Sequence, residues 1–273
     1  MTPGPDSKVQ ASETTSHSDL AEARTYAAAD LPGHVAVIMD GNNRWLKQKG
    51  GKGLDGHVAG AEAARRLIRL CVARNIPLLT LFAFSSENWQ RPQHEVSGLM
   101  DLFARFLQKK EVQQLHENGI CLRFIGNRSR FSATLRKQMA AAERLTQDND
   151  RLSVVVAADY GGRWDITNAA RELAREVQAG RLDPDAIDET ALQSRISGGD
   201  LPPPDLCIRT GGDVRISNFL LWQLAYAELY FTPTLWPDFD EAEFDLALTD
   251  YTCRQRRFGK ISEQLAANNK DGG

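Results

Sequence analysis

A short segment from Asp40 to Arg44 (DGNNR) follows an apolar run and combines residue types that hold both anions and cations. The glycine and the two asparagines tolerate backbone angles that expose amide groups, while the acid and the arginine supply opposite charges. Such a segment could bind one ligand that carries an anion and a metal ion. A turn in which Asp40 caps the following helix is an equally good interpretation, so both stay open.

Two further polar segments follow apolar runs. Ser85 to Pro92 (SSENWQRP) offers hydroxyl, carboxylate, amide and guanidinium groups, although a polar loop with capping serines is the simpler alternative. Arg209 to Asn218 places two arginines around Gly211-Gly212, and arginine forks match phosphate oxygens. Together the three segments predict a phosphate site containing a carboxylate, which could hold a divalent metal ion. The sequence lacks GxGxxG and GxxxxGK[ST], which argues against a Rossmann or P-loop site.

Two isolated residues are weaker candidates. Glu228 closes the apolar run 219–227 and could supply a second oxygen ligand to a metal, although an exposed acid at a strand edge explains it as well. His57 lies at the start of a predicted helix and could donate to a phosphate, although a lone histidine there more often caps or packs.

The elements that must position these groups alternate along the chain. Segments of helical periodicity, such as 61–71 and 96–107, separate short apolar runs that predict buried strands. The runs are His34–Met39, Pro77–Phe84, Cys121–Ile125, Leu152–Ala158, Asp205–Ile208 and Leu229–Thr232. This order predicts an α/β fold, a single domain with a mostly parallel central sheet of six strands flanked by helices. Ligands bind at the carboxyl ends of such strands, where the polar segments lie.

Composition excludes several classes of protein. The 273 residues include 33 Lys and Arg against 36 Asp and Glu, and this balance lacks the basic footprint of a general nucleic-acid binder. The four cysteines form no CxxC pair, so neither a disulfide framework nor a zinc site is indicated. No run of about 18 apolar residues predicts a transmembrane helix. We expect a cytoplasmic protein with a polar tail over 1–30, one domain over 31–259 and a loose tail over 260–273.

With these motifs in place, the chain resembles the cis-prenyltransferase family, and within it the bacterial undecaprenyl diphosphate synthase type. The matching stretches are HVAVIMDGNNRW (34–45), GHVAGAEAARRL (56–67), LTLFAFSSENWQRP (79–92), ADYGGRWDI (158–166), IRTGGDVRISNFLLWQLAYAELYF (208–231), LWPDFD (235–240) and RQRRFG (254–259). They span the presumed domain in family order, which is more specific than any single motif.

The resemblance implies a magnesium-dependent enzyme that condenses isopentenyl diphosphate with an allylic diphosphate, usually farnesyl diphosphate. The product would be a long cis-polyprenyl diphosphate of the undecaprenyl kind, the lipid carrier precursor for cell-wall glycan synthesis. Asp40 would hold Mg²⁺, with Glu228 as a further metal contact. The allylic diphosphate would be held by Gly41, Asn42, Asn43, Arg44 and His57, and that of isopentenyl diphosphate by Arg209, Arg215 and Ser217. Further substrate contacts are expected from Trp45, Gly53, Ser86, Glu87 and Ile216.

A loop that closes over the substrates would contain Ser85, Asn88, Trp89 and Arg91, by the same resemblance. The resemblance also implies that Asn88 takes part in proton removal. Because a neutral amide is a very weak base, we assign Asn88 to orienting a diphosphate oxygen that takes the proton.

Two positions depart from the family pattern. Relatives often carry an arginine where this chain has Gly53, and Lys52 beside it could supply a charge but not a bidentate contact. Many relatives have Glu-His where this chain has Asp213-Val214, and a valine cannot bind a metal. Any metal role of that histidine is therefore absent here.

The resemblance also concerns assembly and product. Arg257-Phe258-Gly259 matches a C-terminal motif that implies a homodimer in which the tail reaches the partner's isopentenyl diphosphate site. Small and apolar residues of the predicted helices 61–71 and 96–107, together with Ala83, could line an apolar tunnel between helices and sheet. Packing in the core is the simpler role for each of these residues. We expect transient contact with the inner face of the membrane when product is released.

Two other functions compete with prenyl transfer. A non-catalytic partner subunit of a two-component prenyltransferase would resemble the family, but such subunits lose the motif acid that Asp40 represents here. A magnesium-dependent phosphohydrolase could use Asp40 as nucleophile or metal ligand.

Deletion of residues 1–30 should leave turnover unchanged, because a polar tail without periodicity has no apolar face to bury. Steady-state rates of the truncated and full-length proteins, compared alongside their circular dichroism spectra, test this. Lost activity with an unchanged spectrum would show that the tail takes part in the chemistry.

Overall fold

The computed structural model describes residues 30–51 and 53–254. Its centre is a six-stranded parallel sheet in the order β3-β4-β2-β1-β5-β6. The strands are β1 (His34–Ile38), β2 (Leu78–Ser85), β3 (Ile120–Ile125), β4 (Leu152–Tyr160), β5 (Leu206–Arg209) and β6 (Glu228–Phe231). The predicted α/β class and all six strands are confirmed, with strand limits that differ by one or two residues.

Helices and helical turns connect the strands. The α-helices are α1 (Asn42–Gln48), α2 (Asp55–Ala73), α3 (Gln93–Phe106), α4 (Lys109–Glu117), α5 (Ala133–Thr146), α6 (Gly162–Gln178), α7 (Glu189–Gln193) and α8 (Glu241–Cys253). The 3₁₀ turns are η3 (Ser86–Gln90), η4 (Arg128–Arg130), η5 (Pro184–Ala186) and η6 (Trp236–Asp238). In the described part of the chain, no helix is long and apolar enough to cross a bilayer.

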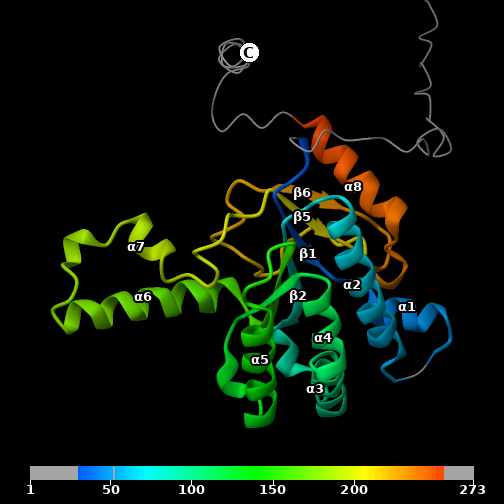
Figure 1. Ribbon diagram of the computed structural model, residues 1–273, viewed down its shortest axis with the longest axis horizontal. Helices are drawn as coiled ribbons and strands as arrows, with labels where there is room; N and C mark the ends of the chain where they lie inside the picture. Colours follow the sequence, from blue (N-terminus) through cyan, green and yellow to red (C-terminus); the bar gives the residue numbers. More distant parts are fainter. Residues whose placement is uncertain (1–29, 52, 255–273) are drawn as a thin grey trace, which may run out of the picture.

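Both faces of the sheet are buried, as continuous apolar strands predict. In β1, Val35 and Val37 face the main core beneath the helices, whereas Ala36 and Ile38 face a smaller core closed by the segment 216–227. Figure 1 shows α2 to α5 grouped beside the sheet, while α6 and α7 form an arm that projects away from it. The sheet is therefore covered by helices on one face and by the segment 216–227 on the other.

Strand order locates the functional edge. From β1 the chain adds β2, then β3 at the edge and β4 between β2 and β3, and it then returns to add β5 and β6 on the other side of β1. The loops that leave β1 and β5 therefore diverge at their carboxyl ends, which is the topological switch point where open α/β sheets bind ligands. Ile38 and Arg209 stand opposite each other at this point.

Candidate active site

Asp40 lies two residues past the end of β1 and is fixed there through its backbone. Its N–H donates to Oγ1 of Thr210 at 3.0 Å, and that hydroxyl donates to the Asp40 carbonyl at 2.7 Å. Thr210, which sequence patterning had not singled out, is fully buried just beyond β5. The two strand ends are thereby joined, and the Asp40 side chain is held at the carboxyl edge of the sheet.

Two guanidinium groups flank the Asp40 carboxylate. Nη2 of Arg209 donates to Oδ2 at 2.9 Å, and Nη2 of Arg44 lies 3.1 Å from Oδ1. Burial opposes ionisation of Asp40, but the hydrogen bond from Arg209 and the charge of Arg44 outweigh it and lower the pKa of the carboxyl group. The Asp40 side chain is therefore ionised at neutral pH, although it is still 30% exposed.

Glycine is required where this cluster closes. Gly211 has φ +87°, and a Cβ there would lie 2.5 Å from Nη2 of Arg44 and 3.0 Å from the carbonyl oxygen of Asp40. Gly41 has φ +115°, and a Cβ there would approach the Leu235 side chain to 2.9 Å. Both glycines let the loops approach closely enough for the charged groups to meet.

Arg209 organises the loop that follows β5. It is 4% exposed, and its Nη1 donates to the hydroxyl of Ser217 at 2.6 Å and to the carbonyl of Arg215. Its Nη2 also donates to Oδ2 of Asp213 at 3.1 Å, an oxygen that accepts a second bond from Arg215 at 2.6 Å. The predicted residues Arg209, Arg215 and Ser217 are therefore brought together with Asp40.

A second cluster gathers around Glu95, a residue that the sequence analysis missed. Its Oε1 accepts from Asn43 at 3.1 Å and from Arg91 at 2.7 Å, and lies 3.6 Å from Nε2 of His57. Three predicted ligand-binding residues from different segments thus converge on one carboxylate. The spacing of Arg91 and Glu95, four residues apart at a helix start, was a usable signal for the pair.

Two buried polar atoms close to the second cluster lack hydrogen-bond partners in the described part of the chain. His57 Nε2 and Asn42 Oδ1 are buried and have no hydrogen-bond partner among the described residues. Burial and the charge of Arg91 lower the pKa of His57, which favours the neutral imidazole. A buried polar atom without a partner is costly, so this pair marks a place where a polar ligand would be stabilised.

The segment after β2 is held by its own side chains. Ser85 N–H donates to the carboxamide oxygen of Asn88 at 3.0 Å. Glu87 accepts from Ser86 at 3.1 Å and from Asn218 at 2.8 Å. Burial opposes ionisation of Glu87, but its hydrogen bonds, above all the one from Asn218, outweigh burial and lower the pKa of the carboxyl group. Glu87 therefore links the segment after β2 to the segment after β5, and its carboxylate accepts hydrogen bonds from side chains of the protein.

Several of the predicted substrate contacts have partners within the protein in this arrangement. Trp89 packs edge-to-face on Phe84, with ring centroids 5.0 Å apart, and so anchors η3 in the core. Trp45 donates from Nε1 to Asp238 at 2.8 Å. Ile216 packs against the smaller core. Gly53 lies in the turn before α2, with no atom within 4 Å of a Cβ placed there, and Lys52 lies outside the described residues.

The structure does not bring Glu228 to Asp40 within one chain. Glu228 opens β6 opposite Leu206, the first residue of β5, so it lies at the amino edge of the parallel sheet. Its carboxylate accepts from Arg254 at 2.8 Å. Strand register, which a sequence pattern does not contain, thus separates Glu228 from Asp40 within one chain, and the metal role of Glu228 stays a prediction.

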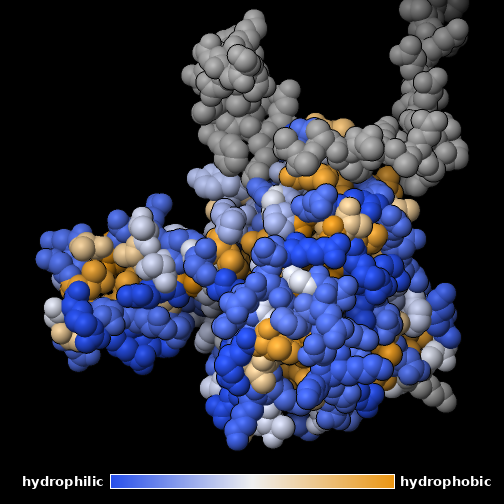
Figure 2. Space-filling model, in the orientation of Figure 1, coloured by the Kyte–Doolittle hydropathy of each residue, from blue (hydrophilic) through white to orange (hydrophobic). Residues whose placement is uncertain are grey.

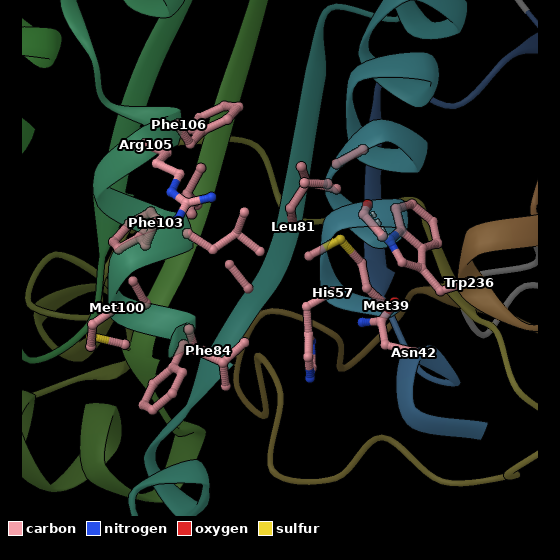
Figure 3. A pocket seen from close by; sticks show the side chains of 18 of the residues that line it. Met39, Asn42, His57, Leu81, Phe84, Met100, Phe103, Arg105, Phe106 and Trp236 are labelled. Atoms are coloured by element: carbon pink, nitrogen blue, oxygen red, sulfur yellow. Dashed lines mark hydrogen bonds between the residues drawn. The ribbon is translucent and has the colours of Figure 1, made fainter. Parts of the chain in front are cut away.

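An apolar cavity of about 930 Å³, including its open mouth, lies between α2, α3 and β2. Figure 3 shows His57 and Asn42 at one end and Phe106 at the other, with Leu81 and Met39 between. Ala61, Ala64 and Ala83 add small side chains to the lining. The candidate site thus joins a charged edge to a space suited to hydrocarbon.

Comparison with known proteins agrees with this geometry. A sequence model of the family described as "Putative undecaprenyl diphosphate synthase" matches residues 38–259. The chain belongs to this family. It is 54% identical over 248 residues to a farnesyl-diphosphate-specific ditrans,polycis-undecaprenyl-diphosphate synthase of Pseudomonas putida, covering 91% of this chain and 98% of that protein. Its identity to the like-named protein of Xanthomonas oryzae pv. oryzae is 58%, over 87% and 92% of the two chains.

Solved structures share the fold. A lavandulyl diphosphate synthase from Lavandula x intermedia, in complex with dimethylallyl diphosphate, superposes with a TM-score of 0.82 at 40% identity, over 85% of this chain and all of that one. A probable undecaprenyl diphosphate synthase from Campylobacter jejuni gives a TM-score of 0.69 at 35% identity, over 84% and 99% of the chains. Because these relatives carry different product names, the fold alone does not define the product.

Replacing Asp40 with alanine should reduce prenyl-transfer turnover at least about 10²-fold, as expected for loss of a preorganised charged group. The protein should still fold, because Asp213 continues to neutralise the buried Arg209. Single-turnover rates and thermal unfolding of the purified variant measure the two effects. Turnover close to that of the wild type in folded protein would contradict the assignment of Asp40.

Proposed function

We propose that this protein condenses isopentenyl diphosphate with an allylic diphosphate, farnesyl diphosphate first, and builds undecaprenyl diphosphate through cis additions. The observation that carries the proposal is the Asp40 carboxylate, held between Arg44 and Arg209 close to the apolar cavity lined by Asn42 and His57. Diphosphate chemistry needs the charged edge, and a growing hydrocarbon needs the cavity. The names of the bacterial relatives support the same reaction.

The two clusters divide the substrates between them. Arg209, Arg215 and Ser217 surround the carboxyl end of β5 and would hold the diphosphate of isopentenyl diphosphate. His57 lines the apolar cavity, and Asn43 lies near it through their shared partner Glu95. These two residues would hold the allylic diphosphate, so that the hydrocarbon enters the cavity. Substrates held in this way would have the allylic carbon and the isopentenyl double bond close together between the clusters.

The donor set at Asp40 fits magnesium, which binds through one or two carboxylates and substrate phosphate oxygens. Asp40 would hold the ion. Asp213 would be a second carboxylate close to it, because Nη2 of Arg209 donates to both side chains. Bound there, Mg²⁺ supplies stabilisation of the negative charge on the departing diphosphate. No group of three or more His, Cys, Asp or Glu side chains converges on a metal position within residues 30–51 and 53–254.

Each addition forms one carbon–carbon bond, releases diphosphate from the allylic substrate and removes a proton from the isopentenyl unit. The carboxamide oxygen of Asn88 is bound to Ser85 N–H, so its amide group is the part that would donate to a substrate oxygen. Asn88 therefore orients the diphosphate oxygen that accepts the proton, in keeping with the weak basicity of an amide.

We extend the proposal to a cytoplasmic homodimer that contacts the membrane when the lipid product leaves. Ile187 on the projecting arm is 43% exposed and Tyr226 is 77% exposed, so apolar surface is available to a second copy. Figure 2 shows hydrophobic residues along the arm of α6 and α7 within a mostly hydrophilic surface. The motif Arg257-Phe258-Gly259 lies outside the described residues.

The test is an assay with farnesyl diphosphate and labelled isopentenyl diphosphate, with and without Mg²⁺. We expect label in long polyprenyl products, one diphosphate released per addition, and loss of both when the metal is chelated. A non-catalytic subunit would give no turnover. A phosphohydrolase would release inorganic phosphate without chain growth, and either result would refute the proposal.

Replacing Ala83 with leucine should shorten the products. Ala83 lies at a register shift in β2 and faces the cavity with its side chain exposed, so added bulk would fill hydrocarbon space rather than overpack the core. Chromatography of the labelled products measures the length. Unchanged length with a loss of stability of about 1 to 3 kcal/mol would show that Ala83 only packs.

A further inference from the structure

Asn218 joins three segments that lie far apart in the sequence. Its side-chain amide donates to Oε1 of Glu87 at 2.8 Å, and Glu87 belongs to η3, the turn that follows β2. Its carboxamide oxygen accepts from the N–H of Arg163 at 2.9 Å, and its backbone carbonyl accepts from the N–H of Gly162 at 2.6 Å. Gly162 and Arg163 open α6, so one residue of the loop after β5 holds both η3 and the start of a helix.

The backbone around Asn218 has an unusual conformation. Ser217, Asn218 and Leu220 have φ angles of +47°, +62° and +40°, in the left-handed region that residues other than glycine rarely adopt. Asparagine tolerates this region better than most residues do. Because such conformations persist only where the surroundings enforce them, and are concentrated at functional sites, this loop is a candidate for a functional role.

The smaller core enforces the conformation of this loop. Phe219 and Leu220 are 0% and 2% exposed, and the ring of Phe219 stacks on that of Phe82 with the centroids 4.4 Å apart. The ring of Tyr160 meets Phe219 edge-on, with the centroids 6.2 Å apart. Because β2 and β4 supply these two rings, Phe219 fixes its neighbour Asn218 relative to both strands.

The segments approach each other closely at this junction. Gly161 precedes α6, and a Cβ there would lie 2.6 Å from Oγ of Ser86 and 2.7 Å from Nδ2 of Asn218. Both separations are shorter than real Cβ contacts. The absence of a side chain at Gly161 therefore lets the segments after β2 and β5 meet.

The neighbours of Asn218 lead to the groups that act on the substrates. Ser217 is adjacent in the chain, and its hydroxyl accepts from Nη1 of Arg209 at 2.6 Å within the set proposed for isopentenyl diphosphate. Glu87 is adjacent to Asn88, whose amide we assign to orienting the diphosphate oxygen that takes the proton. A shift of η3 relative to the loop after β5 would therefore separate groups that must act in the same addition.

We propose that Asn218 is a positioning residue for prenyl transfer, which holds η3 against the loop that binds isopentenyl diphosphate. This inference rests on the proposed function. Glu87 is exposed, so water can replace either partner of the Asn218–Glu87 hydrogen bond, and the bond adds little to the stability of the fold. Its effect falls instead on the relative position of two segments that serve one reaction.

Asn218→Gly removes the side chain and keeps the left-handed backbone, which glycine adopts readily. We expect the KM for isopentenyl diphosphate to rise and kcat to fall, each by about tenfold, since a misplacement of about 1 Å can cost about 10²-fold in rate. Binding of farnesyl diphosphate, measured by calorimetry, should be unchanged because Asn43 and His57 keep their partner Glu95.

Three results with the Asn218→Gly protein would overturn the proposal. The first is a wild-type KM and kcat in folded protein. The second is a fall in kcat that only follows the folded fraction, with KM unchanged, because Asn218 would then support the fold alone. The third is an equal loss of farnesyl diphosphate binding, which would show a general disturbance of the site.

Asn75 provides a matched control. Its backbone is also left-handed, with φ +55°, but it lies between α2 and β2, at the opposite edge of the sheet from the candidate site. Asn75→Gly should therefore leave KM and kcat at their wild-type values. The same kinetic changes in Asn75→Gly as in Asn218→Gly would trace the loss to backbone freedom and refute a role of the Asn218 side chain.

A double-mutant cycle tests the contact itself. Asn218→Asp places a second carboxylate against Glu87 and should lower kcat/KM further than Asn218→Gly, because like charges repel. In the Glu87→Gln background the glutamine amide can donate to the new carboxylate, so the same Asn218→Asp change should cost at least about tenfold less. Equal losses in the two backgrounds would show that the residues act independently and would overturn the proposal.

The wild-type protein in the same assays distinguishes the two proposals. Absence of any elongation in the wild type would refute the proposed function and the positioning role with it. Normal elongation in the wild type, combined with unchanged kinetic constants in folded Asn218→Gly, would refute the positioning role alone.

Discussion

The guanidinium of Arg209 ties the carboxyl ends of β1 and β5 together, and the charged edge of the sheet is built around it. The group is almost fully buried, so it needs carboxylates close by, and Asp40 and Asp213 supply them. Because Arg209 stands in register with Ile38, the ladder itself sets the position of Asp40. An unoriented acid on a flexible loop could not provide the same preorganisation.

The separation of charge from hydrocarbon follows from the same architecture. Parallel strands present their polar loops at one edge, while the helical layer covers a face. Small residues on α2 and β2 leave space between that layer and the sheet, and His57 at the start of α2 stands where edge and space meet. One helix therefore serves both halves of a substrate that is ionic at one end and apolar along the rest.

Strand positions could be predicted because short, continuous apolar runs such as 34–39 and 152–158 fit buried strands better than other elements of a domain of this size. The clustering of Asp40 with Arg209 followed from the rule that parallel strands share a carboxyl edge, and the family resemblance is confirmed. Register and strand order could not be predicted, and they explain why Glu228 lies at the other edge. Glu95 was overlooked because its role arises from three segments that meet only in space.

The bond between Arg209 and Asp40 joins residues 169 positions apart, and this separation affects how the protein is made. A chain still emerging from the ribosome holds β1 to β4 long before β5 exists, so its central strand then has an open edge. Such long-range pairing forms late and slowly. The binding site is therefore completed with the last steps of folding, and partly synthesised chains contain the hydrocarbon-lining helices without the charged edge.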